Sequence, residues 1–295
     1  MSASPHCAPW QMSWMPSVQA EIGWIEAIVL GVVQGLTEFL PISSTGHVFV
    51  ISQLLGWPDP GAAFTAVMQI GTECAVLLYF RKDLARIARA WIRSWAQLRS
   101  LHSMNSDARM GWLIIAGTIP IGVFGLLFAH QIETAARNLW LVAATLIGFG
   151  LVLAAADRWG AKRKSIQELR LRDGVAFGFG QALALIPGVS RSGATISTGL
   201  ALGYTREAAA RYAFLLAIPA VLASGLYEAT KINDGGPVAW GPTILATVVS
   251  FFVGLAVIAW LLRWVSTRSY LPFVIYRIVA GSLLLLLLST GVLTA

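Results

Sequence analysis

The segment 34–47, QGLTEFLPISSTGH, places an acid, a proline, four hydroxyls and a histidine inside an apolar run. A second segment, 187–197, PGVSRSGATIS, interrupts another apolar run in the same way. The two apolar runs are 22–55 and 174–203, and each is divided into two parts by its interrupting segment. Each part is too short to cross a bilayer, which takes about 20 apolar residues. Broken helices at membrane depth are tolerated only where they are buried in protein or line a cavity. The two segments therefore predict a helical membrane protein with its functional site at the breaks.

The composition agrees with a membrane protein. The 295 residues are 57% hydrophobic and only 12% charged, whereas soluble domains carry about 25% charged residues. This excludes a soluble enzyme, a nucleic-acid-binding domain and a disordered chain. Six further apolar stretches are long enough to span a bilayer: 64–80, 111–128, 139–157, 207–227, 240–262 and 272–293.

The distribution of basic residues predicts the orientation of these spans. Fifteen of the 21 lysines and arginines fall in the segments 81–110, 158–173 and 263–271, which we expect in the cytoplasm by the positive-inside rule. The segments 129–138 and 228–239 carry one basic residue each, Arg137 and Lys231, and belong outside. Both broken runs must then be re-entrant, and they must enter from opposite faces of the membrane.

The two broken runs also match at a fixed offset of 147 residues. Gln34 corresponds to Gln181 and Ser43 to Ser190. Three further pairs keep this offset: Gly46 and Gly193, Leu55 and Leu202, Gly56 and Gly203. The predicted fold is an all-α polytopic inverted-topology repeat, in which each half has one re-entrant broken helix pair and three transmembrane helices. Repeat 1 covers about 21–160 and repeat 2 about 174–295. Residues 1–20 lack the pattern of a signal peptide and are expected to form a poorly ordered tail.

The first segment combines an acid with hydroxyl groups. Glu38 follows Gln34 by one helical turn, so both lie on one face. Ionisable residues at membrane depth are costly and indicate function. Glu38 is a candidate base or cation ligand, or a structural partner of Arg191. A run of hydroxyls, Ser43, Ser44 and Thr45, precedes the next apolar helix, where they either bind an anion or only cap the helix.

The second segment is typical of a phosphate site. The planar guanidinium of Arg191 can hold a phosphate with two hydrogen bonds. Around it lie Ser190, Ser192 and Thr195, at the start of another apolar helix. A carboxylate such as Glu38 repels phosphate, unless it activates a nucleophile or holds a divalent cation that bridges to the phosphate.

Two buried ionisable residues stay open on sequence alone. Glu73 lies in the span 64–80 and either faces the same cavity or forms a structural pair. Arg277 lies in the last span and is expected to neutralise a buried acid. Cys7 and Cys74 form no zinc pattern, and Cys74 is expected to be buried.

The segments 34–47 and 187–197 closely resemble the two signature motifs of bacterial undecaprenyl-diphosphate phosphatases of the bacitracin-resistance (BacA/UppP) type. The resemblance extends over nearly all of the chain after residue 20. It implies an inner-membrane hydrolase that converts undecaprenyl diphosphate to the monophosphate carrier, recycles that carrier for peptidoglycan synthesis and confers bacitracin resistance. It also implies a homodimer, a divalent cation (Mg²⁺ or Ca²⁺) and an active site that opens to the outer face.

The resemblance also assigns roles to residues. It places Glu38, Ser44, His47 and Arg191 in the catalytic site with Ser190 and Thr195, and we add Gln34, Ser43, Thr45 and Ser192 as substrate-binding candidates. Some relatives have a second glutamate where this chain has Gln34, so Glu38 must carry more of the metal-binding role. We expect Ser44 to attack the terminal phosphorus with Glu38 or His47 as base. His47 as the covalent nucleophile is the competing assignment.

Two other functions compete with this one. A lipid-phosphate transporter or flippase would also use an inverted repeat, but it needs no nucleophile. A lipid phosphatase of the acid-phosphatase type would need two motif histidines. Here His47 alone lies in a motif, because the other histidines are His6, His102 and His130.

Overall fold

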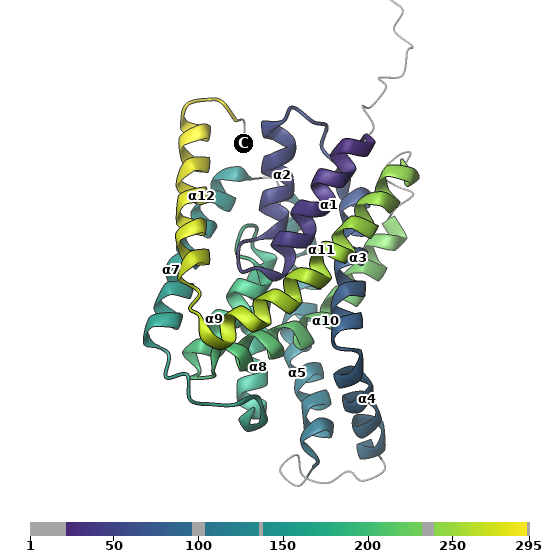
Figure 1. The fold of residues 1–295 in the computed structure, drawn as a ribbon, viewed down its shortest axis with the longest axis vertical. Coiled ribbons are helices and arrows are strands. Elements are labelled where there is room, and N and C mark those ends of the chain that lie inside the picture. Colours follow the sequence, from purple (N-terminus) through teal and green to yellow (C-terminus); the bar gives the residue numbers. More distant parts are fainter. Residues whose placement is uncertain (1–21, 96–103, 136–137, 232–238, 294–295) are drawn as a thin grey trace, which may run out of the picture.

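The computed structural model describes residues 22–95, 104–135, 138–231 and 239–293, and these are helical with no named strand (Figure 1). The predicted tail 1–20 lies outside the described residues. The helices run in the order α1 (Trp24–Phe39), α2 (Ser44–Leu54), α3 (Gly61–Tyr79), α4 (Arg81–Trp95), α5 (Ser106–Leu127), α6 (Ala129–Ala135), α7 (Leu139–Trp159), α8 (Leu171–Ala182), α9 (Arg191–Ala201), α10 (Arg206–Lys231), α11 (Trp240–Thr267) and α12 (Leu271–Ser289). Two short 3-10 helices, η1 (Ile166–Glu168) and η2 (Leu183–Leu185), flank α8.

Five described helices, α5, α7, α10, α11 and α12, are long and apolar enough to cross a membrane. The bent pair of α3 and α4, with 73° between its helices, makes a sixth candidate. Each of the six predicted spans therefore falls on a helix. The chain is a multi-pass membrane protein.

The segment 81–110 differs from the expected loop. Residues Arg81–Trp95 form α4, which packs along α5, and α5 begins at Ser106. The helix forms because its buried face, Ile87 and Ser94, lies opposite a basic face. Trp91 then meets Trp112 of α5 edge to face, and Trp95 packs on Trp112 at a tilt, at centroid distances of 5.6 and 5.4 Å.

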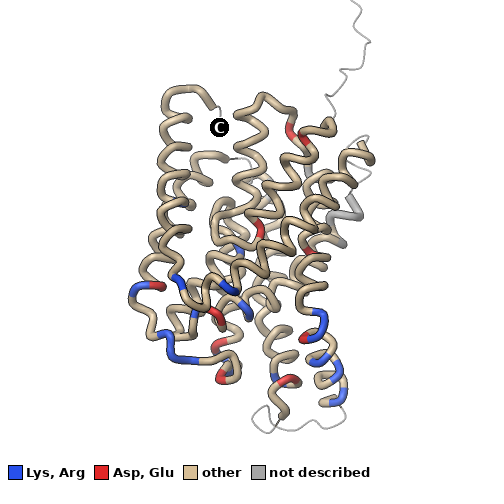
Figure 2. Tube along the Cα trace, viewed as in Figure 1, with Lys and Arg blue, Asp and Glu red and all other residues tan. Residues whose placement is uncertain are grey.

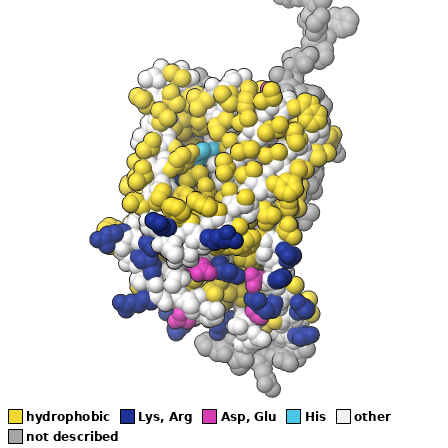
Figure 3. Space-filling model, in the orientation of Figure 1, with side chains coloured by type: hydrophobic (Ala, Val, Ile, Leu, Met, Phe, Trp, Pro, Cys, Tyr) yellow, Lys and Arg dark blue, Asp and Glu magenta, His cyan; other side chains and the backbone are white. Residues whose placement is uncertain are grey.

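The charges separate along the long axis of the molecule. Lysines and arginines gather toward the end of the molecule that carries α4 and the segment before α8 (Figure 2). An apolar surface covers most of the opposite end (Figure 3). In the basic segment, η1 is ordered by Glu168, which accepts hydrogen bonds from the backbone and side chain of Ser165; these bonds lower the pKa of the Glu168 carboxyl.

Close helix contacts depend on small residues. α1 and α3 both pack along α11, and α5 packs along α8. A side chain at Gly71 of α3 would meet the carbonyl of Thr247 on α11. Hydrogen bonds join the same helices, because Ser250 donates to the Met68 carbonyl at 2.8 Å. This use of small and hydroxyl residues is common between membrane helices. Cys74 on α3 is exposed, so the expectation that it is buried was wrong.

Candidate active site

The first break separates α1 from α2 with four residues, 40–43. Ser43 ends the break with φ 78°, in the left-handed region that favours glycine. This conformation turns the chain sharply, so that α2 starts at Ser44 and heads away from Glu38 in the last turn of α1. In Figure 1, α1 and α2 both reach the end of the molecule opposite the basic segments.

The second break has the same form. α9 begins at Arg191, directly after Ser190, which has φ 73°. The Ser190 hydroxyl caps α9 by accepting a hydrogen bond from the Gly193 amide at 3.2 Å. Ser43 and Ser190 are therefore equivalent in backbone conformation as well as in sequence offset.

Arg277 of α12 ties the two breaks together. Its buried guanidinium donates to the carbonyls of Pro41 in the first break, at 2.9 Å, and of Gly188 and Val189 in the second, at 3.1 and 3.0 Å. It also reaches two carbonyls of α7, those of Thr145 and Leu146. Arg277 does not neutralise a buried acid: its hydrogen-bond partners in the described part of the chain are backbone oxygens, whose partial negative charges compensate the cation.

Glu38 is the centre of the polar cluster between the breaks. One carboxylate oxygen accepts from the Ser44 hydroxyl at 2.6 Å and from the Gln34 amide at 2.9 Å. The other oxygen accepts from Arg191. The geometry therefore joins a hydroxyl to a carboxylate that can take its proton, next to a guanidinium that can bind phosphate.

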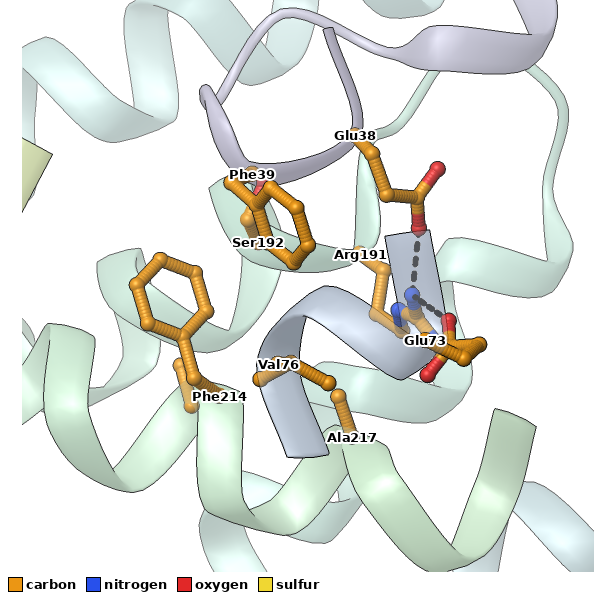
Figure 4. A pocket seen from close by; sticks show the side chains of 9 residues that line it. Glu38, Phe39, Glu73, Val76, Arg191, Ser192, Phe214 and Ala217 are labelled. Carbon is orange, nitrogen blue, oxygen red and sulfur yellow. Dashed lines mark hydrogen bonds and ion pairs between the residues drawn. The ribbon is translucent and has the colours of Figure 1, made fainter. Parts of the chain in front are cut away.

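Glu73 brings a second carboxylate to the same guanidinium. It projects from α3, and its Oε1 lies 3.5 Å from Nη2 of Arg191 (Figure 4). Both glutamates line a small cavity with Arg191, closed on its other side by apolar residues such as Val76 and Phe214. Glu73 thus meets both roles left open for it, because it lines the cavity and also pairs with a basic side chain, Arg191.

The hydrogen bonds of His47 do not involve Ser44 or Glu38. Its Nδ1 bonds the Ser43 carbonyl at 2.6 Å, and its Nε2 bonds the Tyr276 hydroxyl at 2.7 Å. The two rings stack with centroids 5.5 Å apart. Sequence reasoning did not find Tyr276, because nothing in the sequence links residues 229 positions apart.

The other predicted substrate-binding hydroxyls are placed in different ways. Ser192 donates to the Leu40 carbonyl at 3.0 Å, across the two breaks. Thr195 is buried and donates to the Arg191 carbonyl at 2.7 Å. Ser43 is buried, whereas Thr45 is exposed. Their roles in substrate binding stay predictions.

The oxygen donors fit a hard divalent cation. Mg²⁺ is commonly held by one or two carboxylates, with water and substrate phosphate completing its ligands. Glu38 and Glu73 supply two carboxylates beside the hydroxyl of Ser44. Within the described ranges, no group of three or more histidine, cysteine, aspartate or glutamate side chains is arranged to hold a metal.

Comparison with known proteins gives consistent matches. The family model described as "Bacitracin resistance protein BacA" matches residues 27–283. The chain is 57% identical over 275 residues to an undecaprenyl-diphosphatase of Nocardioides sp., covering 93% of this chain and 100% of that one. It is 58% identical over 276 residues to undecaprenyl-diphosphatase 2 of Agrobacterium fabrum, with 93% and 99% covered. The undecaprenyl-diphosphatase of Micrococcus luteus is 57% identical over 277 residues, with 92% and 99% covered.

Proposed function

Because the chain belongs to the BacA family of bacitracin resistance proteins, we propose that it hydrolyses undecaprenyl diphosphate to undecaprenyl phosphate and inorganic phosphate. The observation that carries this proposal is the 2.6 Å hydrogen bond from Ser44 to Glu38, next to Arg191. Phosphoryl transfer can use a hydroxyl as nucleophile with a carboxylate as its base, and this pair supplies both beside a guanidinium that can bind the phosphate.

The reaction proceeds in two steps. The Ser44 oxygen attacks the terminal phosphorus while Glu38 accepts the hydroxyl proton, and the bond from that phosphorus to the bridging oxygen breaks. Undecaprenyl phosphate leaves, and a phosphoserine remains. Water then attacks the phosphorus of the phosphoserine, and the bond from that phosphorus to the Ser44 oxygen breaks. Glu38 returns its proton to the Ser44 oxygen, and inorganic phosphate leaves with the oxygen of the water.

Other groups bind the diphosphate and stabilise its charge. Arg191 donates to the phosphate oxygens, as do the first amides of α2 and α9, whose helices both begin at the breaks. A divalent cation, when bound at Glu38 and Glu73, neutralises further negative charge on the diphosphate. The hydrogen bonds of His47 to Ser43 and Tyr276 favour Ser44 over His47 as the nucleophile.

The symmetry of the breaks supports an inverted-topology repeat with two re-entrant pairs. α2 and α9 both contain 11 residues, and each is followed by a glycine with positive φ, Gly56 or Gly203. α1 packs along α11 as α8 packs along α5. The pair α1–α2 lies toward the end opposite the basic segments, which supports our proposal that the site opens to the outer face of the inner membrane. We include in the proposal a homodimer, recycling of the carrier for peptidoglycan synthesis and bacitracin resistance.

The test is phosphate release from undecaprenyl diphosphate by the purified protein in detergent, with and without Mg²⁺ or Ca²⁺. Wild type is compared with Ser44→Ala, Glu38→Ala and His47→Ala, and Ser266→Ala serves as the control, because Ser266 is an exposed hydroxyl near the end of α11, away from the breaks. We expect Ser44→Ala and Glu38→Ala to lower kcat about 100-fold or more, with little change in the control.

Two results would contradict the proposal at different levels. Near-normal turnover by folded Ser44→Ala would assign the nucleophile to His47. No release by folded wild type with any cation would refute the hydrolase and leave a lipid-phosphate transporter as the function to test.

A further inference from the structure

Glu73 is a buried acid that the two-step reaction does not use as base or nucleophile. It is 6% exposed and lies in the middle of an apolar helix. A carboxylate at membrane depth is costly unless it is paired. Its cationic partner in the described part of the chain is Arg191, the residue that binds phosphate in the proposed reaction.

The way in which the two carboxylates contact Arg191 is informative. Both reach the same nitrogen, Nη2, from opposite elements of the fold, α1 and α3. Among the described residues, neither Nη1 nor Nε of Arg191 has a hydrogen-bond partner. A guanidinium has five N–H donors in a rigid fork. Two carboxylates at one corner therefore fix the plane of the fork and leave its other donors for the phosphate.

The proposed reaction also weakens one of these two contacts. When Glu38 accepts the Ser44 proton it becomes neutral, and its ion pair with Arg191 is lost while charge develops on the phosphate. A second carboxylate that never takes the proton can hold the guanidinium in place during this step.

We propose that Glu73 is a positioning residue, which anchors the Arg191 guanidinium so that its free donors face the diphosphate throughout the transfer. This inference rests on the proposed function. It also explains why α3 contributes a carboxylate to the site, to which α1 contributes Gln34 and a single acid, Glu38.

The variants for the test separate charge from packing. Glu73→Gln keeps the size of the side chain and a carbonyl acceptor but removes the negative charge, and Glu73→Asp keeps the charge on a shorter stem. The matched control is Asp157→Asn, because Asp157 is also a buried acid paired with an arginine, Arg206 at 2.6 Å, but away from the breaks.

The measurements are kcat, KM and melting temperature in phosphate release from undecaprenyl diphosphate, in wild-type and Arg191→Lys backgrounds. We expect Glu73→Gln to lower kcat/KM about tenfold in wild type, with Glu73→Asp closer to wild type and Asp157→Asn changing only the melting temperature. Lysine has no planar guanidinium that could be oriented. Glu73→Gln should therefore lower kcat/KM little further in the Arg191→Lys background, so that the two substitutions are non-additive in a double-mutant cycle.

Each result has one meaning. An equal loss in both backgrounds would show that Glu73 acts independently of Arg191, for example as a cation ligand, and would overturn the inference. A loss that follows the melting temperature alone would show that Glu73 only stabilises the fold and would overturn it too. Unchanged kcat/KM in Glu73→Gln would also overturn it. If wild type itself releases no phosphate, the proposed function fails, which this design distinguishes from failure at Glu73.

Discussion

Replacing Arg277 with methionine tests how the two breaks are held. Methionine has a similar length and no donors, so the carbonyls that Arg277 binds lose their partner. Those of Thr145 and Leu146 lie inside α7 and keep their helical hydrogen bonds. Those of Pro41, Gly188 and Val189 lie in the breaks.

The expected magnitude follows from these three break carbonyls, none of which receives another backbone hydrogen bond in the described residues. An orphaned buried acceptor costs about 1–3 kcal/mol, which gives about 3–9 kcal/mol for three. Removing a buried cation recovers its desolvation cost of several kcal/mol. We therefore expect Arg277→Met to lower the free energy of unfolding by about 3 kcal/mol, the lower end of this range. Phosphate release should also be lost, because both breaks relax.

The assay is reversible unfolding in mixed SDS micelles, followed by tryptophan fluorescence. Arg263→Met is the matched control, since Arg263 is an exposed arginine in the last turns of α11, and it should stay within about 0.5 kcal/mol of wild type. If Arg277→Met unfolded within about 1 kcal/mol of wild type, the argument that this side chain holds the breaks would be refuted.

Two smaller changes test other contacts. Tyr276→Phe keeps the stack on His47 but removes the 2.7 Å hydrogen bond, so kcat/KM for phosphate release should fall by up to about tenfold; an unchanged value would show that the bond has no role in the site. Gly71→Ala forces a methyl group against the Thr247 carbonyl and should cost about 1–3 kcal/mol in the same unfolding assay. Gly148→Ala, in open space on α7, should instead gain up to about 1 kcal/mol, and equal effects at both glycines would contradict the packing argument.

Much of the fold could be predicted because its signals are local. The breaks are marked by Pro41 and Gly188 inside apolar runs, and the structure ends and restarts helices there. The spans are long apolar stretches with basic segments between them. α4 was expected as part of a basic loop, because its many charges are also typical of a loop. Trp91, Ile92 and Trp95 among its arginines indicate an amphipathic segment, but they do not show that it packs along α5.

The site was predictable in its residues but not in all of its contacts. Glu38 and Arg191 stand out as charges in apolar surroundings, and their pairing follows from the predicted meeting of the two breaks. The partners of Arg277 could not be predicted, because they are backbone oxygens and every residue offers one. The place of Glu73 depends on how α3 packs against α11 and α10, which a helical pattern does not specify.

The hydrogen bonds of Arg277 also bear on how the molecule can move. They connect Pro41 and α7 in the first half of the chain with Gly188 and Val189 in the second, through one rigid side chain. A transporter that alternates its access by rocking one half against the other would have to break these hydrogen bonds in every cycle. It would do so inside the membrane, where no water replaces them. We therefore expect the frame around the breaks to stay still during turnover. The mobile partner is then the lipid, whose headgroup must diffuse to the site and leave by the side from which it came.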